Sequence, residues 1–190
     1  DFIGLNTKYI IADGEEKRRI YLDSTASTLM MGIAHRTGEK FLEHYANTHS
    51  LMHFGAKIAT KTYAWVHERI LEFVHADLEH YTCFFTGSGT TAGMNRIARI
   101  FNHLQPSKDV VLVSIMEHHS NDLPHRKHGG HVIHIPVDTH ESKMGCVDLD
   151  LLEHYLMEYE GRVNYVSVTG ISNVTGIINP INEVAKLAHH

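Results

Sequence analysis

Residues 110–116 have the sequence VVLVSIM, and a polar segment, EHHSNDLPH, follows at 117–125. A run of β-branched and other apolar residues without polar alternation is typical of a strand that is buried on both faces. Similar runs follow at 131–137 (HVIHIPV) and 164–171 (NYVSVTGI), and a helical pattern at 149–159 separates these two. Such strands, separated by helices, predict a mostly parallel sheet with helices on both faces, and therefore an α/β fold.

The same kind of pattern extends toward both ends of the chain. A helix is predicted around residues 59–73, because apolar residues recur there at spacings of three and four on one face, which we expect to be buried. A final helix is expected to open at Asn179 and Pro180, with the Asn179 side chain accepting from free backbone donors. The remaining predicted elements are strands at 19–23 and 81–85 and helices at 33–45 and 91–104. No repeat or linker interrupts this order, so we expect a single domain.

The composition suits a packed protein and excludes several classes of function. The chain has 190 residues, of which 43% are hydrophobic, and this is enough for a core. Its formal net charge of -5, from 17 basic and 22 acidic residues, provides no basic face for a nucleic acid. No apolar run is long enough to cross a bilayer, and the first residues lack the order of a secretory signal. We therefore expect a cytoplasmic protein with no membrane or nucleic-acid partner.

Ligands of open parallel sheets bind beyond the carboxyl ends of the strands, and three predicted strand ends carry polar residues. The first is TGSGTTAGMN (86–95), in which Gly87 and Gly89 permit backbone angles that other residues resist. Thr90 and Thr91 bring hydroxyl groups to the start of the next helix. Free amides, the positive end of a helix and hydroxyl donors together form a binding site for an anion, most often phosphate. A plain strand-to-helix turn would use the same glycines.

The second strand end is MEHHSNDLPH (116–125), and the third is TGISNVTG (169–176). A histidine such as His118 can stack on a flat heteroaromatic ligand, act as an acid or base, or bind a metal. Asn173 can point into the same crevice, or it can bond its own backbone in a turn.

Histidines crowd the region around the second strand end, which raises the question of a metal. They are His118, His119, His125, His128, His131 and His134. No pair of them has the HExxH spacing and no nearby cysteine completes a zinc set, so no metal site is predicted. Cys83 and Cys146 form no CxxC pattern, and we interpret both as structural.

Taken in order, four segments resemble the amino-terminal portion of the class V aminotransferases of the cysteine desulfurase and selenocysteine lyase type. They are YLDSTAST (21–28), FFTGSGTTAGMN (84–95), MEHHSNDLP (116–124) and SVTGISNVTGIINPINEVAKLAH (167–189). The resemblance runs from about Ile20 to the end of the chain. It implies an enzyme of fold type I that depends on pyridoxal 5'-phosphate (PLP), that acts on an amino acid and that is generally a homodimer. Removal of sulfur from L-cysteine is the leading reaction, for which a sulfur-acceptor protein is a possible partner.

The resemblance also implies roles for individual residues. It puts Gly89, Thr90 and Thr91 on the cofactor phosphate. It puts His118 over the pyridine ring, where it would also take part in proton transfer as a catalytic residue, and Asn173 on the phenolic oxygen of the ring. It places three weaker candidates, Ala26, Asn47 and His49, near the substrate side of the pocket.

Three departures from the family pattern leave the substrate open. Ala92 stands where many desulfurases have Glu, His49 to Leu51 stand where they show HRG, and His125 stands where a Trp is frequent. A class V aminotransferase, a lyase or an epimerase acting on another amino acid is therefore an alternative to a desulfurase.

In the resembling family, the Asp that pairs with the pyridine nitrogen, the Schiff-base Lys and the catalytic Cys all come after the segment that matches 167–189. Lys57, Lys61, Lys127 and Lys186 match no cofactor-linking motif. We therefore expect residues 1–190 to be an incomplete PLP-binding large domain, inactive alone, that exposes part of an interrupted core.

Two functions from other classes remain as alternatives. The chain could be a noncatalytic module that binds a ligand or a partner. It could also be a nucleotide-dependent oxidoreductase that uses GSGTTAG, although Ala92 replaces the third glycine of that fingerprint.

Overall fold

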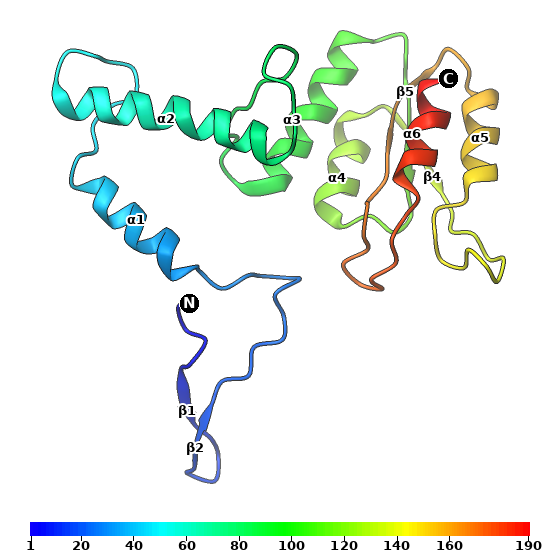
Figure 1. Cartoon of the computed structure of the whole chain (residues 1–190). Coiled ribbons are helices and arrows are strands. Elements are labelled where there is room, and N and C mark those ends of the chain that lie inside the picture. The colour runs from blue at the N-terminus through cyan, green and yellow to red at the C-terminus, as the bar shows by residue number, and fades with distance from the viewer. The chain divides into compact units, whose positions relative to one another are not determined.

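The computed structural model describes residues 1–190, which divide into two compact units, Asp1–Phe85 and Thr86–His190. Figure 1 shows the helices and strands of both units along the chain. That these residues all belong to one domain stays a prediction.

The first unit consists of a small hairpin and two helices (Figure 1). Strands β1 (Lys8–Ile10) and β2 (Glu16–Arg18) pair in antiparallel fashion. Helices α1 (Gly32–Leu42) and α2 (Phe54–Phe73) follow and confirm the two helices that were predicted here.

Two predicted strands of this unit do not form. Residues 19–23 follow β2 without strand pairing, and the Leu22 side chain is 90% exposed. Residues 81–85 also lie outside any strand, and the carbonyl of Cys83 accepts a hydrogen bond from the ring of His67 instead. A strand needs a neighbour to pair its backbone groups, and neither segment has one, so apolar composition alone predicted them wrongly.

The predicted burial of the apolar face of α2 is also only partly correct. Ala59 is fully buried, whereas Tyr63 is 42% exposed and Phe73 is 85% exposed. The Tyr63 ring contacts Phe85 but stays at the surface, because no strand or other helix of the first unit packs extensively against α2. The spacing of apolar residues therefore predicted the helix correctly, but it did not predict how much of the apolar face is exposed.

The second unit contains a parallel sheet of three strands, β3 (Val110–Ser114), β4 (His131–Ile135) and β5 (Val163–Ser167). The strand order is β4-β3-β5, and both pairings are parallel. Every residue of the central strand β3 is buried. Residues 110–114 of the mostly apolar run at 110–116 thus form the centre of the sheet, as predicted.

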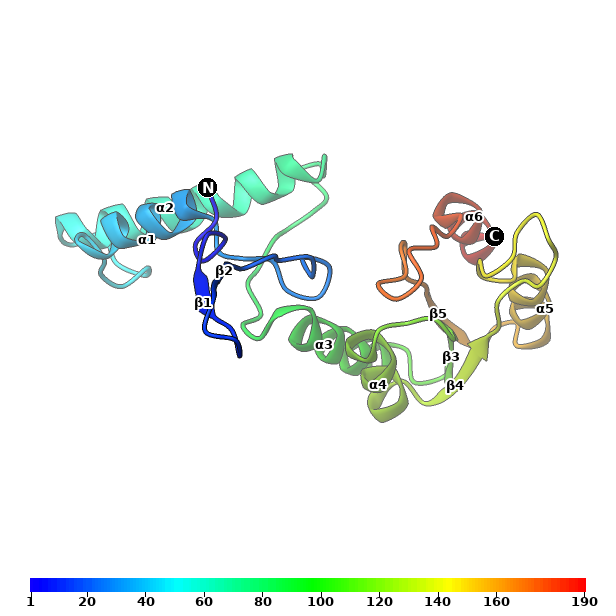
Figure 2. The same cartoon turned by 90° about the horizontal axis from the view of Figure 1, so that it is seen from below.

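Four helices cover this sheet, namely α3 (Gly89–Leu104), α4 (His119–His128), α5 (Leu149–Glu158) and α6 (Ile181–His189). Figure 2 shows α3 and α4 on one face of the sheet and α5 and α6 on the other. The predicted α/β fold with a parallel sheet and helices on both faces is confirmed.

The main core lies between the sheet and the α5–α6 pair. It is formed by Val110, Leu112, Ile135, Val147, Leu152 and Val184. Because side chains alternate along a strand, Val111 and Val113 of β3 face the side of α4. A Cβ atom at Gly129, just after α4, would lie 3.1 Å from the Val111 side chain, which shows how closely this helix end approaches the sheet.

Helix α4 was missed by the sequence analysis, because its buried residues are not an apolar stripe but Asp122, Pro124 and His125. The His118 side chain caps the helix by accepting from the backbone N–H of Ser120 at 3.1 Å. A helix whose buried face is polar gives no hydrophobic periodicity, although its cap and its basic last turn are ordinary helix signals.

The predicted role of Asn179 is wrong in detail. Helix α6 begins at Ile181 with Pro180 in the cap position, and the Asn179 side chain does not cap it. The amide oxygen of the buried Asn179 accepts from the backbone N–H of Val147 at 2.8 Å, and its amide nitrogen donates to the Thr169 carbonyl at 2.8 Å. Asn179 therefore joins two loops at one end of the sheet.

None of the helices combines the length and the apolar composition that crossing a bilayer requires.

Candidate functional site

The carboxyl ends of β3 and β5 lie side by side, because the two strands are parallel neighbours in the sheet. The chain after β3 supplies Glu117 and His118 and then enters α4, while the chain after β5 supplies Thr169. The polar residues of two predicted strand ends therefore meet at one edge of the sheet.

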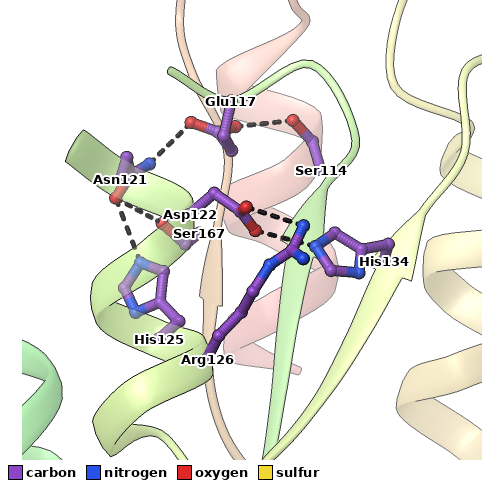
Figure 3. A network of polar contacts seen from close by, with 8 residues as sticks. All are labelled: Ser114, Glu117, Asn121, Asp122, His125, Arg126, His134 and Ser167. Atoms are coloured by element: carbon purple, nitrogen blue, oxygen red, sulfur yellow. Dashed lines mark hydrogen bonds and ion pairs between the residues drawn. The ribbon is translucent and has the colours of Figure 1, made fainter. Parts of the chain in front are cut away.

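The carboxylate of Glu117 is the centre of a hydrogen-bond network at this edge (Figure 3). The Ser114 hydroxyl donates to Oε1 at 2.5 Å, and the Asn121 amide nitrogen donates to Oε2 at 2.6 Å. The backbone N–H of Thr169 also donates to Oε1. One half-buried side chain thus ties the end of β3, the first turn of α4 and the segment after β5 to each other.

The network continues beneath α4 through Asn121 (Figure 3). Its amide oxygen lies 3.1 Å from the Ser167 hydroxyl and 3.1 Å from His125 Nε2. The other ring nitrogen of His125 lies 2.9 Å from the Tyr165 hydroxyl. His125 is fully buried, and this burial lowers its pKa despite the nearby Asp122 carboxylate, while burial raises the pKa of Tyr165 to about 12. Both rings are therefore neutral near pH 7.

A second cluster, centred on Asp122, fastens the middle of α4 to β4 (Figure 3). His134 Nε2 lies 2.8 Å from one carboxylate oxygen, and the Arg126 guanidinium lies 2.7 Å from the other. Burial alone would raise the pKa of the Asp122 carboxyl, but the hydrogen bonds from Arg126 and His134 outweigh it and hold this pKa below its ordinary value of 3.8. The negative charge of Asp122 therefore stabilises the folded protein.

Replacing Asp122 by asparagine should lower the free energy of unfolding at pH 7 by about 1–3 kcal/mol, because the partners lose a charged acceptor. The folded pKa lies below the unfolded one, so this stabilisation is present above pH 3.8 and is lost as the pH falls through the folded pKa. Urea denaturation at several pH values would measure it. The difference between Asp122→Asn and the unchanged protein should shrink in acid, while Glu141→Gln, at an exposed position, should behave like the unchanged protein.

A pocket of about 370 Å³ opens between the first half of α3 and the length of α4. It is lined by Thr91, Asn95, His118, His119, Ser120, Leu123, Pro124 and Lys127. Thr91 and His118, two of the predicted cofactor-binding residues, therefore face one cavity although they are far apart in sequence.

The start of α3 has the free donors that an anion requires. Ser88, in the cap position, makes no side-chain cap hydrogen bond, and no acidic residue lies in the first turn. Gly87 and Gly89 adopt positive φ angles of 84° and 62°, and nothing lies within 4 Å of a Cβ built at either position. The Gly89 N–H donates to the Gly87 carbonyl, whereas the N–H groups of Thr90 and Thr91 have no backbone acceptor, so these two donors and the Thr91 hydroxyl are the set that fits a phosphate group.

His118 has a defined orientation at the opposite wall of the pocket. Its Nδ1 accepts from the backbone N–H of Ser120 and lies 2.8 Å from the Ser120 hydroxyl. The neutral ring consequently carries its proton on Nε2, which makes no hydrogen bond within the protein. His118 therefore holds one proton at an accessible atom beside the pocket.

The other predicted site residues are not brought into this pocket. Gly89 and Thr90 are exposed in the turn that leads to Thr91, and Asn173 is exposed in the loop after β5. In that loop it is Ser172, not Asn173, whose side chain accepts from the backbone, at the N–H groups of Val174 and Thr175. The roles predicted for these residues stay predictions.

The three candidates for the substrate side all belong to the first unit. Ala26 and His49 are exposed, and the side chain of Asn47 accepts from the backbone N–H of His49 at 3.1 Å, so it stabilises its own turn. Their predicted contact with a substrate stays untested.

Glu117, Asn121 and His125 were not predicted as a group. Their spacing of four residues places them on one side of a helical segment, and this would have been the signal had α4 been recognised. His125, a departure from the family pattern, lies on the buried face of α4 and does not line the pocket.

A parallel sheet with helices on both faces (Figure 2) defines the α/β class of proteins, in which ligands usually bind beyond the carboxyl ends of the strands. More particularly, the chain belongs to the class-V aminotransferase family, whose model matches residues 20–190.

Several relatives of this chain are named as cysteine desulfurases. The chain is 27% identical over 176 residues to a probable cysteine desulfurase of Halalkalibacterium halodurans, with 90% of the chain and 41% of the relative covered. It is 31% identical over 175 residues to a cysteine desulfurase of Cronobacter sakazakii, with 89% of the chain and 41% of the relative covered. The chain thus spans about two fifths of the length of these relatives.

A solved structure shows the same fold. The apo cysteine desulfurase from Thermococcus onnurineus superposes with a TM-score of 0.73 at 27% identity, over 90% of this chain and 41% of that one.

Proposed function

We propose that this chain forms the amino-terminal, cofactor-binding part of a PLP-dependent enzyme that removes sulfur from L-cysteine. The observation that carries the proposal is the pocket of about 370 Å³ between α3 and α4, which both Thr91 and His118 line. Membership of the class-V aminotransferase family and the names of the relatives support it.

The residues of the pocket suit two different parts of the cofactor. The free amides at the uncapped start of α3, with Gly89, Thr90 and Thr91, would hold the phosphate. His118 would lie against the ring, and Asn173 would contact its phenolic oxygen if the loop after β5 approaches the pocket. When bound, PLP supplies the electron sink for reactions at the amino-acid carbon. His118 would give or take a proton at Nε2, since Nδ1 is held by Ser120.

The reaction is proposed for the protein that contains these residues together with a Schiff-base lysine, because no lysine of the chain matches a cofactor-linking motif. We propose that this protein is a cytoplasmic homodimer and that it passes sulfur to an acceptor protein. An aminotransferase, lyase or epimerase acting on another amino acid is the alternative, which the departures at Ala92 and at residues 49–51 favour.

Borohydride reduction of the protein from its natural source tests the proposal. Reduction fixes PLP to its lysine, and peptide mass mapping should find a pyridoxyl-lysine in the same polypeptide as residues 1–190. A protein that carries no such adduct would overturn the catalytic proposal and favour a noncatalytic binding module.

Substitution of Thr91 by valine tests the phosphate site separately. Loss of one hydrogen bond to a charged group should raise the Kd for PLP by about tenfold or more. Absorbance titration of the cofactor-free protein would measure it. The matched control is Thr139→Val, at an exposed position outside the pocket, which should leave the Kd unchanged.

A further inference from the structure

The hydrogen bonds around Glu117 have a direction that follows from the chemistry of their groups. An ionised carboxylate only accepts, so Asn121 must turn its amide nitrogen toward Glu117 Oε2, which lies 2.6 Å away. The amide oxygen of Asn121 then faces His125 Nε2 and the Ser167 hydroxyl, each at 3.1 Å. Glu117 therefore decides which way the Asn121 amide points.

The same reasoning fixes the tautomer of His125. Because the Asn121 oxygen can only accept, the neutral His125 ring must carry its proton on Nε2. Its Nδ1 then accepts from the Tyr165 hydroxyl at 2.9 Å. The bonds run in one direction, from Tyr165 through His125 and Asn121 to Glu117. Glu117 is the acceptor at which this chain of hydrogen bonds ends.

The directional chain ends directly beside the pocket. Glu117 immediately precedes His118, and the His118 carbonyl accepts from the backbone N–H groups of Asn121 and Asp122 at 2.8 and 3.1 Å. Oε1 of Glu117 also holds the end of β3 through Ser114 and the segment after β5 through Thr169. The residue before His118 and the helical turn after it are thus fixed by a single carboxylate.

We infer that Glu117 is a positioning residue, whose carboxylate orients the Asn121–His125–Tyr165 chain and thereby fixes His118 at the wall of the pocket. The part of this inference that concerns the cofactor rests on the proposed function. The orientation of the chain does not, since it follows from the contacts of the protein alone.

Glu117→Gln provides a sharp test, because glutamine has the same shape but presents a donor where Oε2 was. The Ser114 and Thr169 donors need an acceptor and hold the new amide oxygen at the Oε1 position. The new amide nitrogen then faces Asn121, whose amide must turn over. Asn121 in turn presents a donor to His125, so the His125 proton should move from Nε2 to Nδ1.

The direction should be restored in the double variant Glu117→Gln/Asn121→Asp. An aspartate at 121 accepts from the new glutamine, from Ser167 and from His125 Nε2. The carboxylate then lies at position 121 instead of 117, and both side chains keep the size and shape of those they replace. Glu153→Gln, at an exposed position on α5, is the matched control for the loss of one carboxylate.

The tautomer can be read from the ring-nitrogen NMR signals of protein labelled with ¹⁵N-histidine, with His125 assigned through His125→Gln. We expect an Nε2–H tautomer in the unchanged protein, in Glu153→Gln and in the double variant, and an Nδ1–H tautomer in Glu117→Gln. An Nδ1–H tautomer in the unchanged protein would overturn the inference even if no variant folds. An unchanged tautomer in Glu117→Gln would also overturn it.

The positioning of His118 is measured by the Kd for PLP in the same proteins. Loss of one contact between His118 and the cofactor should raise this Kd by about tenfold in Glu117→Gln, and the double variant should recover most of the loss. Equal Kd values in Glu117→Gln and the unchanged protein would contradict the positioning role. Failure of the unchanged protein to bind PLP would instead contradict the proposed function, and the tautomer result would stand.

Discussion

Replacing His118 by phenylalanine in the enzyme that we propose should lower the rate of sulfur release from L-cysteine by about a hundredfold to ten-thousandfold, the range for loss of a general acid or base. Phenylalanine keeps a flat ring at the wall of the pocket but has no proton to hold. In the structure that proton lies on Nε2, because Nδ1 accepts from the backbone N–H of Ser120. The substitution therefore separates stacking on the cofactor from proton transfer.

The measurement is steady-state sulfide release by the protein that carries its cofactor, together with a titration of PLP binding. We expect His118→Phe to retain PLP binding and to lose turnover when PLP is saturating. The matched control is His154→Phe, at an exposed position on α5 outside the pocket, which should keep its turnover. If His118→Phe turned over at the unchanged rate, His118 would be a stacking group only.

Shortening Leu112 to alanine should lower the free energy of unfolding by about 2–5 kcal/mol. Leu112 is fully buried at the centre of β3, the middle strand of the sheet, and it belongs to the core between the sheet and the α5–α6 pair. Both the lost burial and the cavity left behind contribute to this value, because strands on both sides prevent the site from collapsing.

Urea denaturation followed by circular dichroism would measure the loss. Leu104→Ala removes the same atoms at the end of α3, where the side chain is 66% exposed, and should change the free energy of unfolding by less than about 0.5 kcal/mol. Equal effects of the two substitutions would show that β3 is not the centre of the core.

The parts of the fold that could be predicted are those in which the chain's own pattern decides the structure. Residues 110–114 of the mostly apolar run at 110–116 became the buried central strand, and the regular spacing in 59–73 became a helix. The segment 81–85 is equally apolar, yet it forms no strand, because pairing depends on a neighbour that composition does not reveal.

The site was predictable only in part for a related reason. Thr91 and His118 could be proposed because each follows a predicted strand, and the structure places both at one pocket. Glu117 and Asn121 could not, since they act through contacts with Ser167 and Thr169, which lie far away along the chain. Only the fold brings such partners together.

The directed chain of hydrogen bonds from Tyr165 to Glu117 also restricts how these positions can change during evolution. Because each group dictates whether its neighbour gives or receives a proton, positions 117, 121, 125 and 165 cannot drift independently. A single change at any of them reverses or breaks the order of the rest, whereas paired changes can preserve it. We expect descendants of this gene to vary at these four positions in concert, as one heritable unit.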